Sequence, residues 1–211
     1  MDTAAPVSAV WRPQLLQLYQ GAGAANCSFV AALALDPEAV QKYGGAAAYF
    51  VNFTIDAAPE ASDPTLSVEL LWVNKTATRM AEASFMSFAP ALEPAPSNAS
   101  YSMDVLGSRV SPLEVVDMGT QHLHAVWDGV GYDNRAAGGA FVWIQALDTP
   151  LVAPGDAEHL LVYDGLARPD MAGGWHFNVH NNAWGTAFPQ WYGDNARARW
   201  LLTLASPANG L

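Results

Sequence analysis

The sequence predicts an all-β fold, an antiparallel β-sandwich with one or two short helices near the N-terminus. Beyond the first forty-odd residues the apolar side chains recur with period two, which indicates strands buried on one face. Stretches rich in Pro, Gly, Asp and Asn separate about eight such segments, a number typical of sandwiches and barrels. A chain of 211 residues can bury a large core in one domain. We therefore expect a partly irregular N-terminal extension over residues 1–35 and a sandwich domain over residues 36–211.

One or two short helices are expected near the N-terminus. Gln14–Gln20 is a candidate for a short helix, although it lacks a good cap. Pro37–Tyr43 is better marked, because Asp36 can cap the first turn and Pro37 sets its backbone angle. Glu38 and Lys42 suit the positive and negative ends of that helix.

The strands follow in order along the rest of the chain. They are expected at Ala48–Ile55, Thr65–Val73, Ala83–Phe88, Gln121–Val130, Phe141–Leu147, Leu160–Tyr163, Trp175–His180 and Arg197–Leu204. Alternation puts three apolar sets on the buried faces: Leu66, Val68, Leu70 and Trp72; Phe141, Trp143 and Leu147; Ala198, Trp200, Leu202 and Leu204.

The charge balance excludes one class of partner. Nine basic residues against twenty acidic ones leave a net charge of -11, and the only lysines are Lys42 and Lys75. No stretch can neutralise a run of phosphates, so we expect no nucleic-acid partner for this acidic protein. No apolar run approaches the ~20 residues that cross a bilayer, so we expect no membrane insertion.

The first hundred residues carry a signal for glycosylation. All four Asn residues there open an N-x-S/T sequon: Asn26, Asn52, Asn74 and Asn98. This favours a glycoprotein of the secretory pathway or the extracellular space. Met1–Trp11 lacks a basic n-region and an apolar h-region, so we expect no signal peptide of the chain's own. If the sequons are used, the chain is a piece of something longer.

The second half of the chain holds the candidate binding residues, with six of the eight Trp and all five His after residue 120. On the strand from Trp175, one face is apolar and the other carries His and Asn, and a Trp-rich loop follows. Such a surface combines hydrogen-bonding groups with flat apolar rings, as a sugar pocket requires. The candidates for carbohydrate binding are His176, Asn178, His180, Asn182, Trp184, Trp191, Tyr192 and Asp194. The alternative is that Trp184, Phe188 and Trp191 are core residues that hold a long loop.

A second cluster is His122, His124 and Asp128, which strand alternation puts on one face. His-x-His on a strand can chelate a metal, with the carboxylate as a ligand or an orienting group. The alternative is a pair of hydrogen-bonded histidines on a half-wet sheet, and no metal site is assigned.

Motifs for nucleophilic catalysis and phosphate binding are missing from the sequence. Carboxylates are plentiful, but nothing selects two of them as a glycosidase pair. The catalytic residues therefore stay unassigned.

The same segments resemble a known group, the C-terminal portion of proteins related to glycoside hydrolase family 38, the alpha-mannosidase-like proteins, in which it is a domain of unknown function. The resemblance covers most of the chain from about residue 40. Its matching stretches are Thr76–Ala83 with Ser87-Phe88, Gln121–Trp127, Leu147–Asp156, Gly174–Asn178, Asn182–Thr186, Phe188-Pro189, Trp191-Tyr192 and Ala196-Arg197.

The resemblance implies an all-β tail of the super-sandwich type that follows a catalytic domain and packs on it. In that family the zinc ion, its His and Asp ligands and the nucleophilic Asp belong to the N-terminal catalytic domain. No segment of this chain matches that domain, so we expect no cofactor here, with zinc only through a separate catalytic domain, and no activity of the chain alone.

Three hypotheses follow. The first is a non-catalytic C-terminal domain of an alpha-mannosidase-like glycoside hydrolase that supports or completes a carbohydrate site, with the catalytic domain or a carbohydrate as its partner. The second is a stand-alone carbohydrate-binding or cell-surface structural module. The third is a small lectin-like or metal-dependent enzyme that uses His122, His124 and Asp128.

Overall fold

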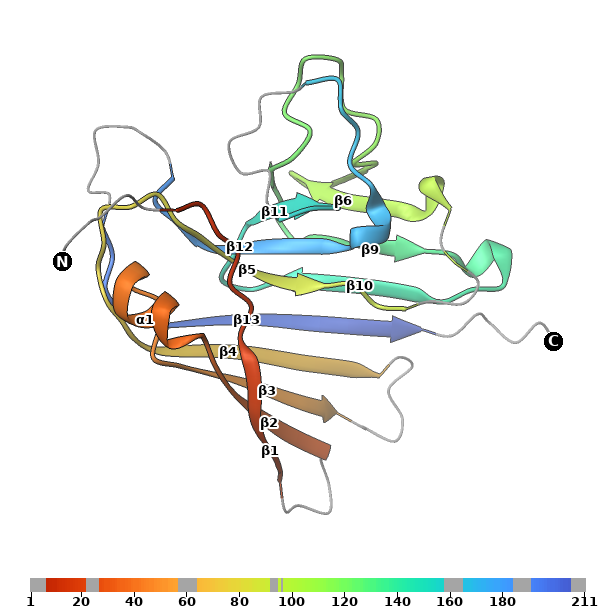
Figure 1. Cartoon of the computed structure of the whole chain (residues 1–211). Helices are drawn as coiled ribbons and strands as arrows, with labels where there is room; N and C mark the ends of the chain where they lie inside the picture. The colour runs from red at the N-terminus through yellow and green to blue at the C-terminus, as the bar shows by residue number, and fades with distance from the viewer. Residues whose placement is uncertain are drawn as a thin grey trace.

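Two antiparallel sheets packed on each other make up the computed structural model, so the expected all-β, sandwich-like class is confirmed (Figure 1). The structure describes residues 7–21, 27–56, 64–91, 95, 97–157, 165–183 and 191–205. The larger sheet has nine strands in the order β1-β2-β3-β4-β13-β10-β9-β6-β7, and the smaller has four in the order β5-β12-β11-β8.

The elements of the described residues have the following bounds. The larger sheet contains β1 (Gln14–Gln20), β2 (Cys27–Ala34), β3 (Ala48–Asp56), β4 (Thr65–Lys75), β6 (Tyr101–Val105), β7 (Ser108–Val110), β9 (Gly129–Asp133), β10 (Phe141–Ala146) and β13 (Asp194–Ala205). The smaller sheet contains β5 (Ala83–Phe88), β8 (His124–Ala125), β11 (Leu151–Pro154) and β12 (Trp175–Asn181). The helices are α1 (Pro37–Tyr43) and three 3-10 turns, η1 (Asn98–Ser100), η2 (Arg135–Ala137) and η3 (Met171–Gly173).

The core lies between the two sheets. Phe88 of β5, Phe177 of β12 and Trp200 of β13 form a ring cluster, with centroids 5.7–6.0 Å apart. Phe177 and Trp200 are fully buried. The apolar faces predicted for β4, β12 and β13 are therefore confirmed as core faces.

The face predicted for β10 is wrong. Val142 and Ile144 face the core and are almost fully buried, whereas Trp143 lies on the opposite side, where the Arg109 guanidinium covers its ring at 3.8 Å. The neighbour of Trp143 on β9 is Gly131. A Cβ built there would come within 3.0 Å of the indole, so the missing side chain makes the room that the ring occupies.

Helix α1 is confirmed with the predicted bounds. Asp36 Oδ1 accepts the Glu38 N–H at 2.8 Å, and the helix ends at Gly44, which adopts the left-handed conformation with φ 73°. Lys42 Nζ lies 3.2 Å from Glu38 Oε1, one turn away. These local signals are enough to define a seven-residue helix.

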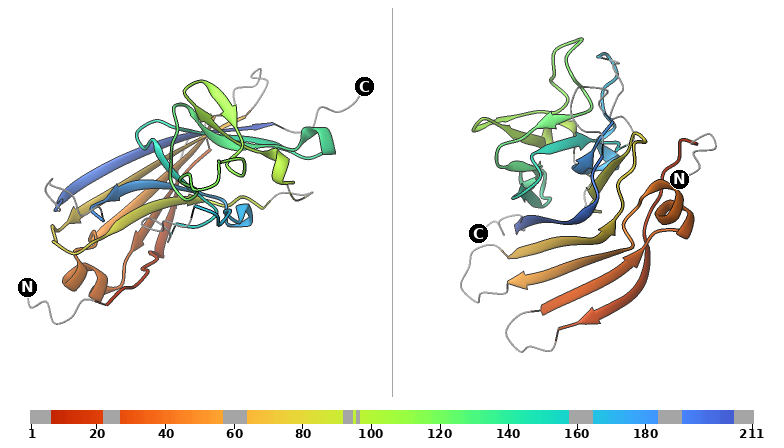
Figure 2. Two further views of the ribbon diagram at one scale, coloured as in Figure 1. Left: turned by 90° about the horizontal axis from the view of Figure 1, so that it is seen from above. Right: turned by 90° about the vertical axis from the view of Figure 1, so that its left-hand side faces the viewer.

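The helix predicted over Gln14–Gln20 is wrong, because this segment is strand β1. It pairs with β2 along its length, and β2 pairs in turn with β3. The sheet therefore begins well before residue 36. All seven residues of β1 are exposed, and β1 lies at the edge of the larger sheet, beyond the smaller sheet (Figure 2).

The single strand predicted over Gln121–Val130 is also wrong, because the chain changes sheets within it. The Val126 N–H bonds to Pro150 O, next to β11, and the following Trp127 N–H bonds to Asp104 O of β6. The short β8 thus belongs to the smaller sheet and β9 to the larger one. β2, β6, β7 and β11 were not expected as strands, and the strand predicted over Leu160–Tyr163 lies outside the described residues.

Candidate functional site

The site is built where the ends of β4 and β12 meet the start of β13 and the connection from residue 76 to residue 82. The alternation of β4 breaks at Asn74, which adopts φ 55°. Asn tolerates this left-handed conformation better than most residues. The break turns the next side chain, Lys75, inward, and Lys75 is only 5% exposed.

Lys75 makes three contacts in its buried position. Its Nζ lies 2.7 Å from Glu82 Oε1 and donates to the carbonyls of Gly44 and Thr76 at 3.3 Å each. The side chains of Lys75 and Glu82 are 3% and 19% exposed. A buried ammonium group needs such partners, since an unpaired one would be strongly destabilising.

Glu82 is the centre of this network. Its backbone N–H donates to Asn182 Oδ1 at 2.6 Å, and the Asn182 N–H donates to Glu82 O at 3.0 Å. The His180 Nε2 lies 3.6 Å from Glu82 Oε1. Two of the predicted binding residues, His180 and Asn182, therefore gather around a carboxylate that the sequence did not single out.

Aromatic rings enclose the network. The rings of Trp72 and Tyr192 lie 6.3 and 5.2 Å from the His180 ring, and Tyr192 Oη donates to Asn195 O at 2.9 Å. Within the described part of the chain, Trp72 Nε1, Thr78 Oγ1 and His180 Nε2 are buried with no hydrogen-bond partner. The end of the sandwich thus holds unused polar atoms beside a fixed ion pair.

Trp191 lies on the surface of this region and is 57% exposed. The Arg79 guanidinium carbon lies 5.4 Å from the centroid of its ring. Asp194 is exposed at the start of β13, next to Lys75 in the strand register. The predicted candidates Trp191, Tyr192 and Asp194 therefore lie in the same region as His180 and Asn182, and Trp191 is a surface residue rather than a core residue.

His176 and Asn178 do not join this group. The register of β12 shifts between Asn178 and His180, which breaks the alternation that would have put all three on one face. His176 Nδ1 lies 2.7 Å from Ser87 Oγ of β5, and burial lowers the pKa of His176. Asn178 Oδ1 accepts from Asn181 Nδ2 at 2.6 Å. Trp184, the remaining candidate, lies outside the described residues.

Lys75, Glu82 and Arg79 are the members of the site that sequence reasoning missed. Their positions depend on the left-handed Asn74 and on a bond between residues 100 positions apart. One signal was available: Lys75 is one of only two lysines, and it ends a strand of apolar alternation.

The change of sheet separates Asp128 from His122 and His124, the other two weak metal candidates. His124 Nε2 lies 3.3 Å from Gln121 O, and burial lowers the pKa of His124. Asp128 accepts from Trp143 Nε1 at 2.8 Å and from Gln145 Nε2 at 2.7 Å. Among the described residues no three His, Cys, Asp or Glu side chains gather as metal ligands, so His122, His124 and Asp128 do not form the donor set that zinc needs.

Comparison with models of protein families, with curated proteins and with solved structures finds no match. No helix in the described part of the chain is long and apolar enough to cross a membrane.

The sequons differ in their surroundings. Asn74 and Asn98 are exposed, at the end of β4 and at the start of η1. Asn52 lies inside β3, where it pairs with Val30 and Glu69 on the two neighbouring strands. Asn26 lies outside the described residues.

Eight of the nine basic residues contact an acidic or aromatic side chain among the described residues. Ion pairs join Lys42 to Glu38, Lys75 to Glu82, Arg135 to Asp133, Arg168 to Asp117, Arg197 to Glu69 and Arg199 to Asp148, and Arg79 and Arg109 lie over the rings of Trp191 and Trp143.

Proposed function

We propose that this chain is a non-catalytic β-sandwich domain of an alpha-mannosidase-like glycoside hydrolase and that it supports or completes a carbohydrate site. The observation that carries the proposal is the exposed ring of Trp191, which directly precedes Tyr192 and has the Arg79 guanidinium carbon 5.4 Å from its centroid. An exposed aromatic ring on a rigid support is the element that sugar recognition needs first.

The chemistry of the surface suits a sugar ring. The Trp191 indole offers a flat apolar face for the C–H groups of a pyranose, and the exposed Asp194 and Arg79 offer an acceptor and donors for its hydroxyls. Glu82 and Asn182 bond each other just before β5 and just after β12, which limits motion at this end of the smaller sheet. Because these residues are already ordered, ligand binding loses little further conformational entropy here.

The chain binds rather than cleaves in this proposal. By the resemblance, zinc and the nucleophile belong to a separate catalytic domain, and the described residues here hold no metal ligand set. The four sequons support a secretory or extracellular location for the whole protein.

The uncovered end of the larger sheet favours a domain partner over a stand-alone module. On β1, Leu15, Leu16, Leu18 and Tyr19 are each 54–67% exposed. Apolar surface gathered in this way normally marks an interaction site, and an edge strand of this kind is an aggregation risk unless covered. A catalytic domain packed on β1 would cover it.

Titration calorimetry of the full chain with methyl α-mannoside and a mannose oligosaccharide tests the binding part. We expect saturable binding that Trp191→Ala weakens at least tenfold, since aromatic contacts at binding sites exceed about 1.4 kcal/mol. The control is Trp127→Ala, whose indole is 77% exposed between β8 and β9. Equal loss in both variants, or binding unaffected by Trp191→Ala, contradicts the proposal.

Mixing the chain with the separately expressed catalytic domain of an alpha-mannosidase-like enzyme tests the docking part. Leu16→Glu on β1 should abolish the complex, and Leu106→Glu, at an 86% exposed position after β6, should leave it intact. If sugar binding is found but no complex forms, the stand-alone module replaces the accessory domain.

A further inference from the structure

A pocket of about 310 Å³ opens at the start of β12, whereas the site around Trp191 lies at the end of that strand. β12 has seven residues, so the two regions are about 20 Å apart along the strand. The pocket lies between the end of β5, the start of β12 and the strands β6 and β9. Its size is at the lower end of the range of small-molecule pockets, about 300–1,000 Å³.

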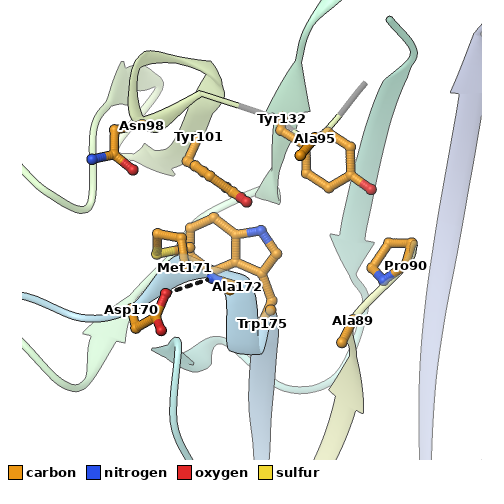
Figure 3. A pocket seen from close by; sticks show the side chains of 11 residues that line it. Ala89, Pro90, Ala95, Asn98, Tyr101, Tyr132, Asp170, Met171, Ala172 and Trp175 are labelled. Carbon is orange, nitrogen blue, oxygen red and sulfur yellow. Dashed lines mark hydrogen bonds between the residues drawn. The ribbon is translucent and has the colours of Figure 1, made fainter. Parts of the chain in front are cut away.

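Aromatic side chains form its walls (Figure 3). The rings of Tyr101 and Tyr132 pack edge to face, with centroids 5.8 Å apart, and Tyr101 meets Trp175 at 6.4 Å. Met171 and Pro90 add apolar surface. The three rings hold one another in place, so the pocket is formed before any ligand arrives.

Two polar atoms of these walls are unused. Trp175 Nε1 and Tyr132 Oη are buried and have no hydrogen-bond partner among the residues that the structure describes, and their residues are 0% and 3% exposed. In Figure 3 the Trp175 indole nitrogen faces the two tyrosines. Leaving a buried donor without an acceptor costs free energy. Trp200 Nε1 is also unpartnered, but Trp200 does not line the pocket.

A carboxylate stands among the lining residues. Asp170 is exposed, and its Oδ1 accepts the Ala172 N–H at 3.0 Å, which leaves further acceptor capacity. None of the described residues that line the pocket is a Lys, Arg or His. The site therefore offers buried donors inside and one acidic acceptor at the exposed side.

We propose that this pocket binds a small neutral hydroxylated molecule, a polyol or one sugar ring. A hydroxyl group is at once the acceptor that Trp175 and Tyr132 lack and a donor for Asp170. A cation cannot accept hydrogen bonds from the two buried groups. An anion is repelled by the Asp170 carboxylate, and no positive charge among the described lining residues compensates for this. The C–H faces of such a molecule pack on the aromatic walls. This site does not depend on the carbohydrate surface at Trp191.

The test observes the indole ¹⁵N–¹H signal of Trp175 in the full 211-residue chain. Trp175→Phe assigns the signal, and through-bond correlation assigns it if that variant does not fold. The chain is titrated at millimolar concentrations with glycerol, methyl α-glucoside, tetramethylammonium chloride and sodium acetate. We expect a saturable shift with glycerol if the ligand is a polyol, with the glucoside if it is a sugar ring, and none with either salt.

Three variants locate the binding. Tyr132→Phe removes one unpartnered hydroxyl at almost constant shape and should weaken binding about 3- to 10-fold. Asp170→Asn should weaken it too, because it removes the charge from the bond to the ligand hydroxyl. Tyr43→Phe, on α1, is the control and should change nothing. Each unfolding midpoint is measured, so that a misfolded variant is recognised.

Several outcomes would overturn the proposal. They are the absence of any saturable Trp175 shift with both hydroxylated molecules, a shift with tetramethylammonium, and a titration that Tyr132→Phe leaves unchanged. Trp191→Ala should leave the Trp175 titration as it is. If sugar binding at Trp191 is not found, the proposed function is wrong, but the proposal for the Trp175 pocket still stands.

Discussion

Asn182 and Glu82 hold each other by two hydrogen bonds that run in opposite directions. Asn182 Oδ1 accepts the Glu82 N–H at 2.6 Å, and the Asn182 N–H donates to the Glu82 carbonyl at 3.0 Å. Glu82 directly precedes β5, so the pair extends the β5–β12 ladder of the smaller sheet one residue beyond Ala83 and Asn181. It thereby holds Glu82 in place for its ion pair with Lys75 of β4, in the larger sheet.

Asn182→Ala should destabilise the protein by about 1–3 kcal/mol, because it leaves the Glu82 N–H unpaired in a partly buried place. Denaturant unfolding measures the change. Gln17→Ala, on the exposed strand β1, is the control and should shift stability by less than about 0.5 kcal/mol. Equal stability of the two variants would show that the Asn182–Glu82 hydrogen bonds contribute nothing to stability.

Lys75→Met should cost about 3 kcal/mol, because it leaves the Glu82 carboxylate without its main partner in a largely buried place. Adding Glu82→Gln should restore part of the loss, so the double variant should cost less than the sum of the single ones. Lys42→Met breaks the exposed pair with Glu38 and should have little effect. Simple additivity at Lys75 and Glu82 would contradict the coupling.

Stability should fall as the pH drops below about 6.5. Burial lowers the folded-state pKa values of His176 and His124 below their ordinary 6.5, with a nearby His122 adding to the effect at His124. The unfolded chain therefore takes up these protons first, so stability is full above about 6.5 and is lost towards the lower folded pKa values.

His176→Gln should flatten part of that pH profile. Thermal unfolding at a series of pH values from 8 to 5 measures it. A separate loss belongs to lower pH. The Arg135 and Arg199 side chains bond Asp133 and Asp148 and hold the pKa values of these carboxyls below their ordinary 3.8. Their contribution is lost only as the pH falls below about 4. An identical profile for His176→Gln above pH 5 would remove His176 from this account.

Expression through a eukaryotic secretory route should add glycan mass that a peptide N-glycosidase removes. The exposed Asn74 and Asn98 should be modified more fully than Asn52, which lies inside the β3 ladder. Mass spectrometry of tryptic peptides gives the occupancy of each site, and Asn74→Gln and Asn98→Gln assign it. An unmodified chain would count against the secretory location.

The purified chain should not hydrolyse aryl mannosides, with or without added zinc, because neither a carboxylate pair nor a nucleophile motif is selected in its sequence. Release of the aryl alcohol is followed against a blank without protein. Turnover that depends on the protein and disappears on substitution of one Asp would overturn the non-catalytic proposal.

Local signals made some elements predictable. The cap at Asp36 and the stop at Gly44 define α1, and period-two alternation found β5 and β12 within a residue. β1 was missed because Leu15, Leu16 and Tyr19 follow a helical spacing, and only its pairing with β2 makes it a strand.

The candidate site was predictable only in part, for the same reason. Tyr192 and Asn182 stand in one short stretch with His180, so composition pointed to them. Lys75 and Glu82 come from another part of the chain and meet the stretch through long-range contacts. No local pattern encodes such a meeting.

The engagement of the basic residues has a consequence for any partner. Eight of the nine Lys and Arg side chains already face a carboxylate or an aromatic ring of the same chain. Six of the twenty acidic residues are in those ion pairs, and the net charge of the chain stays at -11. We expect a positively charged partner to associate faster than a neutral one, at a rate that falls steeply as salt is added.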